Sequence, residues 1–248
     1  GKILSNTVSS QLIHSNYGGV VPEIASREHE RLLNYVLHKS IKESKVDITD
    51  INLISVTNGP GLSGALLTGV SFAKGLALGL NIPIIPINHL EAHIFSNFLA
   101  DPSLKYPFVC LLVSGGHTQL WHVEGFEKYE LLGETRDDAA GEAFDKGARI
   151  FGLKYPGGPE IEKYSIGGNP KAHQFPRGLI SNNSLEFSFS GLKTSLLYFM
   201  DNFQESKTLK KRDIIASYQQ AIVDTLVEKM KRSIAKTKVK NCVIAGGV

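Results

Sequence analysis

The sequence contains two cysteines in 248 residues, and neither belongs to a CxxC pair, so a thiolate metal site is not expected. Cys110 and Cys242 lie in short apolar runs, FVCLLV and NCVIAG, which predict buried, reduced thiols rather than a disulfide. No apolar run approaches the roughly 20 residues of a membrane-spanning helix. No signal-like or transit-like segment opens the chain. A cytoplasmic protein with no membrane partner is expected. For a eukaryotic source a mitochondrial or plastid location stays open, because a leading segment could have preceded Gly1.

The composition is that of an ordinary globular protein, with 42% hydrophobic and 21% charged residues. The length suits one large or two medium domains. The net charge is only +3, but residues 205–240 are markedly basic, with ten Lys or Arg against four Asp or Glu. Such a stretch could bind a phosphate backbone, although a solvated helix face explains it better on charge alone.

Hydrophobic spacing predicts strands and helices in alternation. Strands are expected over 3–8, 51–57, 82–87, 108–113, 117–123 and 241–245, and helices over 23–45, 63–80, 89–99, 138–151, 159–167, 190–202 and 210–236. The strands on either side of residues 114–116 predict a hairpin. Asp101-Pro102 and Lys105-Tyr106-Pro107 suggest a boundary between domains 1–104 and 105–248. The pattern predicts an α/β fold with mixed sheets flanked by helices, present twice.

The segment HLEAH places His89 and His93 four residues apart on a predicted helix. Positions i and i+4 share a helix face, so both imidazoles can reach one metal ion. The spacing alone leaves an ordinary pair of surface or core histidines equally open. It is not the HExxH of zinc proteases, because Leu90 follows the first histidine and Glu91 lies roughly opposite the ligand face. A further ligand must come from elsewhere in the protein.

Three glycine-containing segments are candidate anion sites, since successive backbone amides can form a concave site for a phosphate. The first is Val113–Thr118 (VSGGHT), the second is Tyr155–Pro159 (YPGGP), and the third is the terminal Ala245-Gly246-Gly247. The competing interpretation of the first segment is a tight hairpin turn that needs positive φ at its two glycines.

Acidic residues line one face of the predicted helix 138–151, at Asp138, Glu142 and Asp145. The helix dipole explains acids in the first turn. Asp145 lies beyond that turn and could bind ribose hydroxyls or a second cation. The segment FSFSGLKT (187–194) resembles an anion cradle at a helix start but lacks the spacing of a phosphate loop, so a P-loop NTPase is rejected.

Taken together and in this order, the motifs resemble the TsaD family of tRNA threonylcarbamoyladenosine enzymes. They are GGVVPEIASREHE (18–30), NGPGLSGALLTGVSFAKGLA (58–77), NHLEAH (88–93), LLVSGGHTQL (111–120), GETRDDAAGEAFDKGAR (133–149), YPGGPEIEK (155–163), FSFSGLKTS (187–195) and AGGV (245–248). The resemblance covers the whole chain. It implies the duplicated actin/Hsp70/sugar-kinase-like (ASKHA) fold, with the metal motif in the first domain and the nucleotide motifs in the second.

The resemblance also implies the reaction. The threonylcarbamoyl group passes from threonylcarbamoyl-AMP to N6 of adenosine 37 in tRNAs that read codons beginning with adenine. His89 and His93 would bind one divalent metal, Fe²⁺ or alternatively Zn²⁺, and no residue would serve as a covalent nucleophile. The implied substrate-binding residues are Leu112, Val113, Ser114, Gly115, Gly116, Asp145, Gly158 and Glu162. Relatives often carry Asp at position 162, and Glu keeps the acceptor but lengthens its reach.

The implied partners are the anticodon loop of tRNA, a TsaB-like heterodimer partner and a TsaE-like ATPase. The resemblance predicts that the chain is truncated at both ends. A first strand with an ETSCDE-like segment would precede Gly1, and an adenine-loop Asn and an Asp, the third metal ligand, would follow Val248. The alternatives are a TsaB-like scaffold, a sugar or acetate kinase of the same superfamily, and a metalloprotease. The histidine pair argues against the first two, and the missing general base argues against the third.

Overall fold

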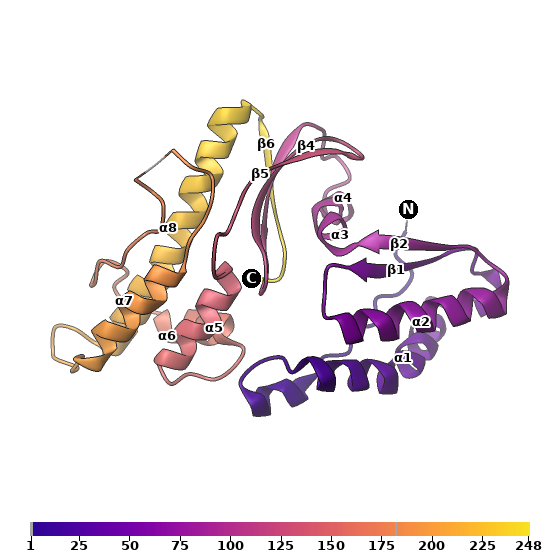
Figure 1. Cartoon of the computed structure of the whole chain (residues 1–248), viewed down its shortest axis with the longest axis horizontal. Coiled ribbons are helices and arrows are strands. Elements are labelled where there is room, and N and C mark those ends of the chain that lie inside the picture. The colour runs from indigo at the N-terminus through magenta and orange to yellow at the C-terminus, as the bar shows by residue number, and fades with distance from the viewer. Residues whose placement is uncertain (1, 182) are drawn as a thin grey trace. The chain divides into compact units, whose positions relative to one another are not determined.

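The computed structural model describes residues 2–181 and 183–248, which form two compact units, Gly1–Ala92 and His93–Val248 (Figure 1). The predicted boundary lay later, between residues 104 and 105. Residues 93–104 belong with the second unit because Phe98 packs against Tyr106 and Phe108, with ring centroids 5.2 and 5.9 Å apart. Aromatic burial therefore determines where the second unit begins.

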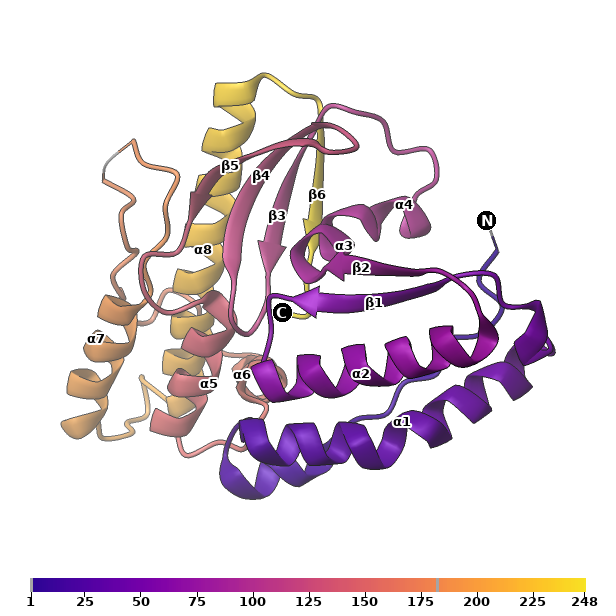
Figure 2. The ribbon, with the colours of Figure 1, turned by 45° about the vertical axis from the view of Figure 1, so that its right-hand side comes forward.

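The first unit contains a two-stranded parallel sheet among its described residues. Strands β1 (Ile54–Gly59) and β2 (Ile84–Asn88) pair from Ile54 opposite Ile84, and helices α1 (Pro22–Ser44) and α2 (Ser63–Leu80) pack against each other beside them (Figure 2). Two short 3₁₀ helices span Leu12–Tyr17 and Ile48–Asp50.

The strand predicted over residues 3–8 is wrong, since the segment has no regular structure. Instead of pairing with a strand, the segment forms side-chain hydrogen bonds with α1. The hydroxyls of Ser5 and Ser40 are 2.8 Å apart, and Thr7 Oγ1 donates to Glu43 at 2.8 Å. The local sequence of residues 3–8 could not reveal that helix contact.

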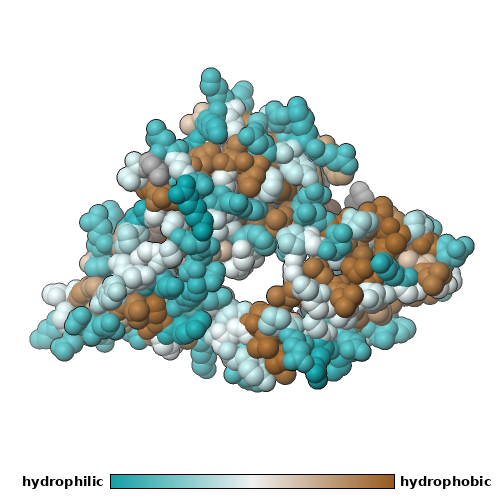
Figure 3. Space-filling model, in the orientation of Figure 1, coloured by the Kyte–Doolittle hydropathy of each residue, from teal (hydrophilic) through white to brown (hydrophobic). Residues whose placement is uncertain are grey.

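Helix α2 corrects the expectation that no apolar run reaches membrane length. By length and composition alone it could cross a membrane, which for a single helix is weak evidence. Its exposed apolar side chains include Leu67 and Leu78, and Figure 3 shows hydrophobic residues on the surface of this unit. Small residues allow α2 to approach α1, since a Cβ on Gly64 would meet the side chain of Ser26.

The second unit contains a four-stranded mixed sheet in the order β5-β4-β3-β6. Its strands are β3 (Phe108–Val113), β4 (Thr118–Gly125), β5 (Lys128–Glu134) and β6 (Asn241–Ala245). Strand β4 is antiparallel to β3 and β5, whereas β6 is parallel to β3. The predicted hairpin is confirmed. Strand β5 was missed because its sequence, KYELLGE, is charged and mostly exposed.

The position of β6 at the edge of this sheet corrects the prediction for one cysteine. Both cysteines are free, and Cys110 in the inner strand β3 is buried, which raises the pKa of its thiol to about 12. Cys242 in β6 is exposed. Its apolar surroundings in the sequence indicated a strand correctly but could not indicate an edge strand.

Helices cover the sheet of the second unit. They are α4 (Asn97–Ala100), α5 (Ala140–Ile150), α6 (Gly157–Ser165), α7 (Ser190–Asp201) and α8 (Lys211–Thr237), while α3 (His89–Phe95) spans the boundary between the units. The helix predicted over 89–99 is interrupted at Ser96, whose hydroxyl donates to the carbonyl of His93 at 2.8 Å. Serine hydroxyls compete in this way with the backbone ladder of a helix.

Tyr218 on α8 joins the helices of the second unit. Its hydroxyl donates to the carbonyl of Ala143 at 2.8 Å, and its ring packs edge-on against Phe151 and Phe175. The ring lies so close to Gly147 that a Cβ there would come within 2.4 Å of it. Glycine at position 147 is therefore what allows α5 to lie against α8.

We expect Gly147→Ala to lower the free energy of unfolding of the second unit by about 1–3 kcal/mol, because the added methyl overpacks the core. Gly191→Ala is the matched control, since it also lies in a helix of this unit and its Cβ would meet nothing within 4 Å. Denaturant unfolding measures both. Equal stability of the two variants would contradict the close packing of α5 on α8.

Candidate functional site

A cavity of about 550 Å³ lies in the second unit, where the β3–β4 loop, the first turns of α5 and α6, one face of α8 and the segment after β6 meet. It is lined by Gly115, Gly141, Phe144, Asp145, Tyr155, Pro156, Gly158, Pro159, Glu162, Gln219, Val223, Gly247 and Val248. Four of the predicted site residues, Gly115, Asp145, Gly158 and Glu162, come together in this cavity.

The β3–β4 loop is closed by its own polar groups. The N–H of Ser114 donates to the carbonyl of His117 at 2.8 Å, and the N–H of His117 donates to the Ser114 hydroxyl at 3.0 Å. Neither Gly115 nor Gly116 has a positive φ, so the turn does not require glycine for its conformation. Both are exposed, and a Cβ on either would meet nothing within 4 Å. The tight-turn interpretation therefore does not explain these glycines, whereas the approach of a ligand does.

The first turn of α5 lies directly behind this loop. The N–H of Ala140 donates to the buried Thr118 hydroxyl at 2.8 Å. A Cβ on Gly141 would lie 2.7 Å from the carbonyl oxygen of Ser114 and 2.8 Å from the Cα of Gly115. Glycine thus lets the start of the helix touch the loop, and the positive end of the helix dipole favours an anion there.

Asp145 links α5 to the start of α6. Its Oδ1 accepts a hydrogen bond from the N–H of Gly157 at 2.7 Å, which leaves its second oxygen available toward the cavity. Burial raises the pKa of Asp145, and the hydrogen bond from Gly157 opposes that shift. A Cβ on Gly157 would collide with Asp145, but a Cβ on Gly158 would meet nothing. The two glycines therefore differ: Gly157 permits packing, and Gly158 leaves open space for a ligand.

The segment after β6 closes another side of the cavity. Gly246 has φ +109° and lies against the carbonyl of Val113, so a side chain there is strained and obstructed. The N–H of Val248 donates to the same carbonyl at 3.3 Å. Together with Phe144 and Val223, Val248 gives the cavity apolar walls with few polar groups, as ligand sites commonly have.

The remaining predicted substrate-binding residues do not line the cavity. Leu112 and Val113 are buried in β3, so only their backbone could face a ligand. Ser114 and Gly116 lie in the loop beside Gly115. Conversely, Gln219 and Val223 on α8 line the cavity and were missed, because the helix was considered only for its charge. Gln219 accepts a hydrogen bond from the Ser165 hydroxyl at 3.2 Å through Oε1, which directs its amide group.

The segment FSFSGLKT binds an anion supplied by the protein itself. The carboxylate of Asp137 accepts hydrogen bonds from the hydroxyls of Ser188 and Ser190 and from the N–H groups of Phe189 and Ser190, at 2.6–3.2 Å. Burial alone would raise the pKa of Asp137, but these four bonds outweigh it and hold the pKa below its usual value. The anion cradle predicted at the start of α7 therefore binds the carboxylate of Asp137.

The other two acids, Asp138 just before α5 and Glu142 in its first turn, form ion pairs. Lys146 lies 2.7 Å from both Asp138 and Glu142, and Lys193 lies 3.8 Å from the second oxygen of Asp138. Of the three acids predicted on one helix face, only Asp145 therefore lines the cavity.

His89 and His93 lie one turn apart on α3, and both are half-buried. Asn88, the last residue of β2, starts this helix by accepting hydrogen bonds from the N–H groups of Leu90 and Glu91 at 2.8 and 3.3 Å. Across residues 2–181 and 183–248, no group of three or more His, Cys, Asp or Glu side chains could hold a metal ion. The pair fits two positions of a metal site whose other ligands come from outside α3.

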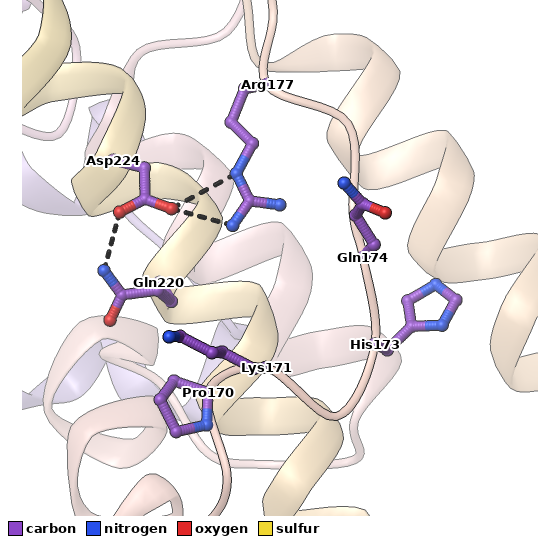
Figure 4. Close-up of a pocket in the computed structure, with 7 residues that line it drawn as sticks. All are labelled: Pro170, Lys171, His173, Gln174, Arg177, Gln220 and Asp224. Carbon is purple, nitrogen blue, oxygen red and sulfur yellow. Dashed lines mark hydrogen bonds and ion pairs between the residues drawn. The ribbon is translucent and has the colours of Figure 1, made fainter.

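A second cavity, of about 500 Å³, lies between α8 and residues 170–177 (Figure 4). Three of its lining residues bind one another: Arg177 donates to Asp224 at 2.7 and 3.2 Å, and Gln220 donates to the other oxygen of Asp224 at 2.7 Å. No sequence motif marked it. Because its one carboxylate is already bound by two neighbours, it is a weaker candidate than the glycine-lined cavity.

We expect Gly158→Val to weaken binding of AMP at least about tenfold, because the side chain would occupy the open space beside the α6 start. Gly191→Val is the matched control, since it is also the second residue of its helix and faces open space. Calorimetric titration with AMP measures both. Unchanged AMP affinity in Gly158→Val would show that nucleotide does not bind in this cavity.

Comparison with known proteins shows which family the chain belongs to. The family model described as "TsaD: tRNA N6-adenosine threonylcarbamoyltransferase" matches residues 2–248. The enzyme of that name from Thermosipho melanesiensis is 52% identical over 248 residues, covering 100% of this chain and 75% of the relative. The one from Desulfitobacterium hafniense is 51% identical over 249 residues, covering 100% and 73%.

Similarity to solved structures is weaker. Component A of the Acidaminococcus fermentans (R)-2-hydroxyglutaryl-CoA dehydratase matches with a TM-score of 0.49 and 16% identity, over 87% of this chain and 68% of that one. YeaZ from Pseudomonas aeruginosa matches with a TM-score of 0.33 and 14% identity, over 42% and 49%. It is the sequence relatives and the family model that identify the protein: the chain belongs to the tRNA N6-adenosine threonylcarbamoyltransferase family, which makes the t6A modification of tRNA.

Proposed function

We propose that the glycine-lined cavity of the second unit holds threonylcarbamoyl-AMP while its threonylcarbamoyl group is transferred to N6 of adenosine 37, in tRNAs that read codons beginning with adenine. The observation that carries this proposal is the meeting of Gly115, Asp145, Gly158 and Glu162 in one cavity. They come from three separate sequence motifs, and their chemistry matches that of an adenylate.

Each part of the nucleotide has a counterpart in the cavity. The backbone amides of the exposed Gly115 and Gly116 and the adjoining start of α5 suit the phosphate. The carboxylates of Asp145 and Glu162 suit the ribose hydroxyls, which can donate to them. The apolar walls at Phe144, Val223 and Val248 suit the adenine ring. Leu112 and Val113 would contribute through the backbone of β3 alone.

The transfer itself needs little covalent chemistry from the protein. The N6 amine of the adenosine attacks the carbamoyl carbon, the bond between that carbon and the phosphate oxygen breaks, and AMP leaves with the electron pair. The amine gives up one proton to solvent. Because AMP is a stable anion, binding its phosphate at backbone amides and aligning the two substrates supply most of the acceleration. No covalent nucleophile is required.

His89 and His93 would hold a divalent metal, Fe²⁺ or alternatively Zn²⁺, with at least one further ligand from outside the pair. When bound, the metal would supply Lewis-acid polarisation of the transferred carbonyl group. The half-buried position of both imidazoles, and the way Asn88 fixes the start of α3, support this assignment.

The relatives are bacterial, which favours a bacterial set of partners in the cytoplasm. We include among them a TsaB-like protein that forms a heterodimer and a TsaE-like ATPase. The tRNA would present its anticodon loop, in which the target base is already unpaired and can enter a site without melting a duplex.

The double variant His89→Ala/His93→Ala tests the metal assignment. In the full-length protein, with partner proteins, threonylcarbamoyl-AMP and an ANN-decoding tRNA, we expect loss of bound metal and at least about a hundredfold loss of t6A formation, because the metal ligands are gone. Metal analysis and nucleoside analysis measure the two effects. His38→Ala, an exposed histidine on α1, is the control. Full activity of the double variant would disprove the role of the pair.

A further inference from the structure

Exposed lysines gather at one end of the second unit. Residues 229–248 contain six Lys or Arg and no Asp or Glu. Helix α8 ends at Thr237, Lys238 caps it in a left-handed conformation, and β6 begins at Asn241. Lys236, Lys238 and Lys240 are all exposed in this short stretch. Figure 3 shows hydrophilic residues at this tip of α8, at the top of the view.

A fourth lysine comes from a distant part of the sequence. The side-chain amide of Asn241 donates to the carbonyl of Lys105 at 3.0 Å, which places the exposed Lys105 beside the start of β6. We call these four residues, Lys105, Lys236, Lys238 and Lys240, the basic end.

Other basic residues of α8 have structural roles instead. Lys229 is fully buried and donates to the carbonyls of Leu179 and Ser184 at 2.6 Å each. Arg232 donates to Glu228 at 2.8 Å and to the carbonyl of Ile180 at 2.7 Å. These two fasten the loop before FSFSGLKT to the helix. Lys231, which lies between these two in the sequence, is exposed but is not part of the basic end.

The helix dipole explains part of this pattern, because cations are favoured in the last turn of a helix. That argument covers Lys236 and Lys238. It does not cover Lys240, which lies beyond the cap, or Lys105, which belongs to the segment before β3. Four positive charges from two chain segments at one surface indicate an anionic partner.

The basic end lies far from the glycine-lined cavity. Val223 lines the cavity, and Lys236 lies thirteen residues further along the same helix, which is about 20 Å at the helical rise. Strand pairing also places the two sites at opposite ends of β3. Phe108 at the start of β3 pairs with Asn241, whereas Val113 at its other end contacts the segment that closes the cavity. A nucleotide in the cavity cannot reach these lysines.

We propose that the basic end binds the sugar–phosphate backbone of the tRNA outside the anticodon loop, while the target adenosine meets the threonylcarbamoyl-AMP held in the glycine-lined cavity. This rests on the proposed function of the cavity. The substrate is a polyanion much longer than 20 Å, and lysine–phosphate contacts position nucleic acids without reading their sequence. The basic end thereby sets the affinity for whole tRNA and not the chemistry at N6.

The test replaces the three clustered lysines with glutamine, K236Q/K238Q/K240Q, in the full-length protein with its partners. We expect the KM for full-length tRNA to rise about tenfold, with kcat and the KM for threonylcarbamoyl-AMP within about twofold of the unsubstituted protein. The slope of log affinity against log salt concentration should fall by about 2–3, since each lost phosphate contact removes about 0.9. A short anticodon stem-loop RNA should be modified equally well by both proteins.

Helix α1 offers a matched control, K39Q/K42Q/K45Q. These lysines are also exposed, Lys42 lies in the last turn of the helix, and Lys45 is likewise a left-handed C-cap. This variant removes the same charge, and it should leave tRNA affinity unchanged. The variant K236R/K238R/K240R should retain normal tRNA affinity, which separates charge from folding defects.

Two results would overturn the proposal. One is an unchanged tRNA affinity and salt slope in K236Q/K238Q/K240Q. The other is loss of assembly with the partner proteins while tRNA binding stays normal, which would make the basic end a protein interface. Failure of the proposed function would look different, because the unsubstituted enzyme itself would then form no t6A.

Discussion

The close approach of backbone segments at the carboxyl ends of β3 and β6 is the constraint on which the candidate site depends. Gly141 lets the start of α5 touch the Ser114–Gly115 loop, and Gly246 lets the segment after β6 lie against Val113. A side chain at either position would force these segments apart. Because the cavity walls are those same segments, its shape follows from contacts that only glycine permits.

Charge in the second unit is used in two separate ways. Inside, carboxylates bind the protein itself: Asp137 starts α7, and Lys146 pairs with Asp138 and Glu142. These paired carboxylates hold the helices in place. They do not line the cavity, which therefore contains few acids. Outside, the lysines of the basic end have no acidic neighbour in residues 229–248 and remain available to a polyanion.

Much of the fold and part of the site were predictable from the sequence. Helices such as α2 and α8 and the β3–β4 hairpin follow from local periodicity, the α/β class follows from the alternation of strands and helices, and the family follows from motifs in order. Local patterns failed where a distant neighbour decides. Residues 3–8 follow α1 instead of a strand, β5 is a strand in spite of its charges, and Cys242 is exposed because β6 lies at an edge.

The sequence by itself determined the chemistry of the protein, because glycines, acids and the histidine pair at fixed spacings identify the family and its reaction. Only the tertiary structure decided which of those residues meet. It brings Gly115, Asp145, Gly158 and Glu162 into one cavity, adds Gln219 and Val223, and shows that FSFSGLKT holds Asp137. Spacing along a chain fixes neighbours within a helix turn or a hairpin, whereas meetings across the fold depend on how helices and strands pack.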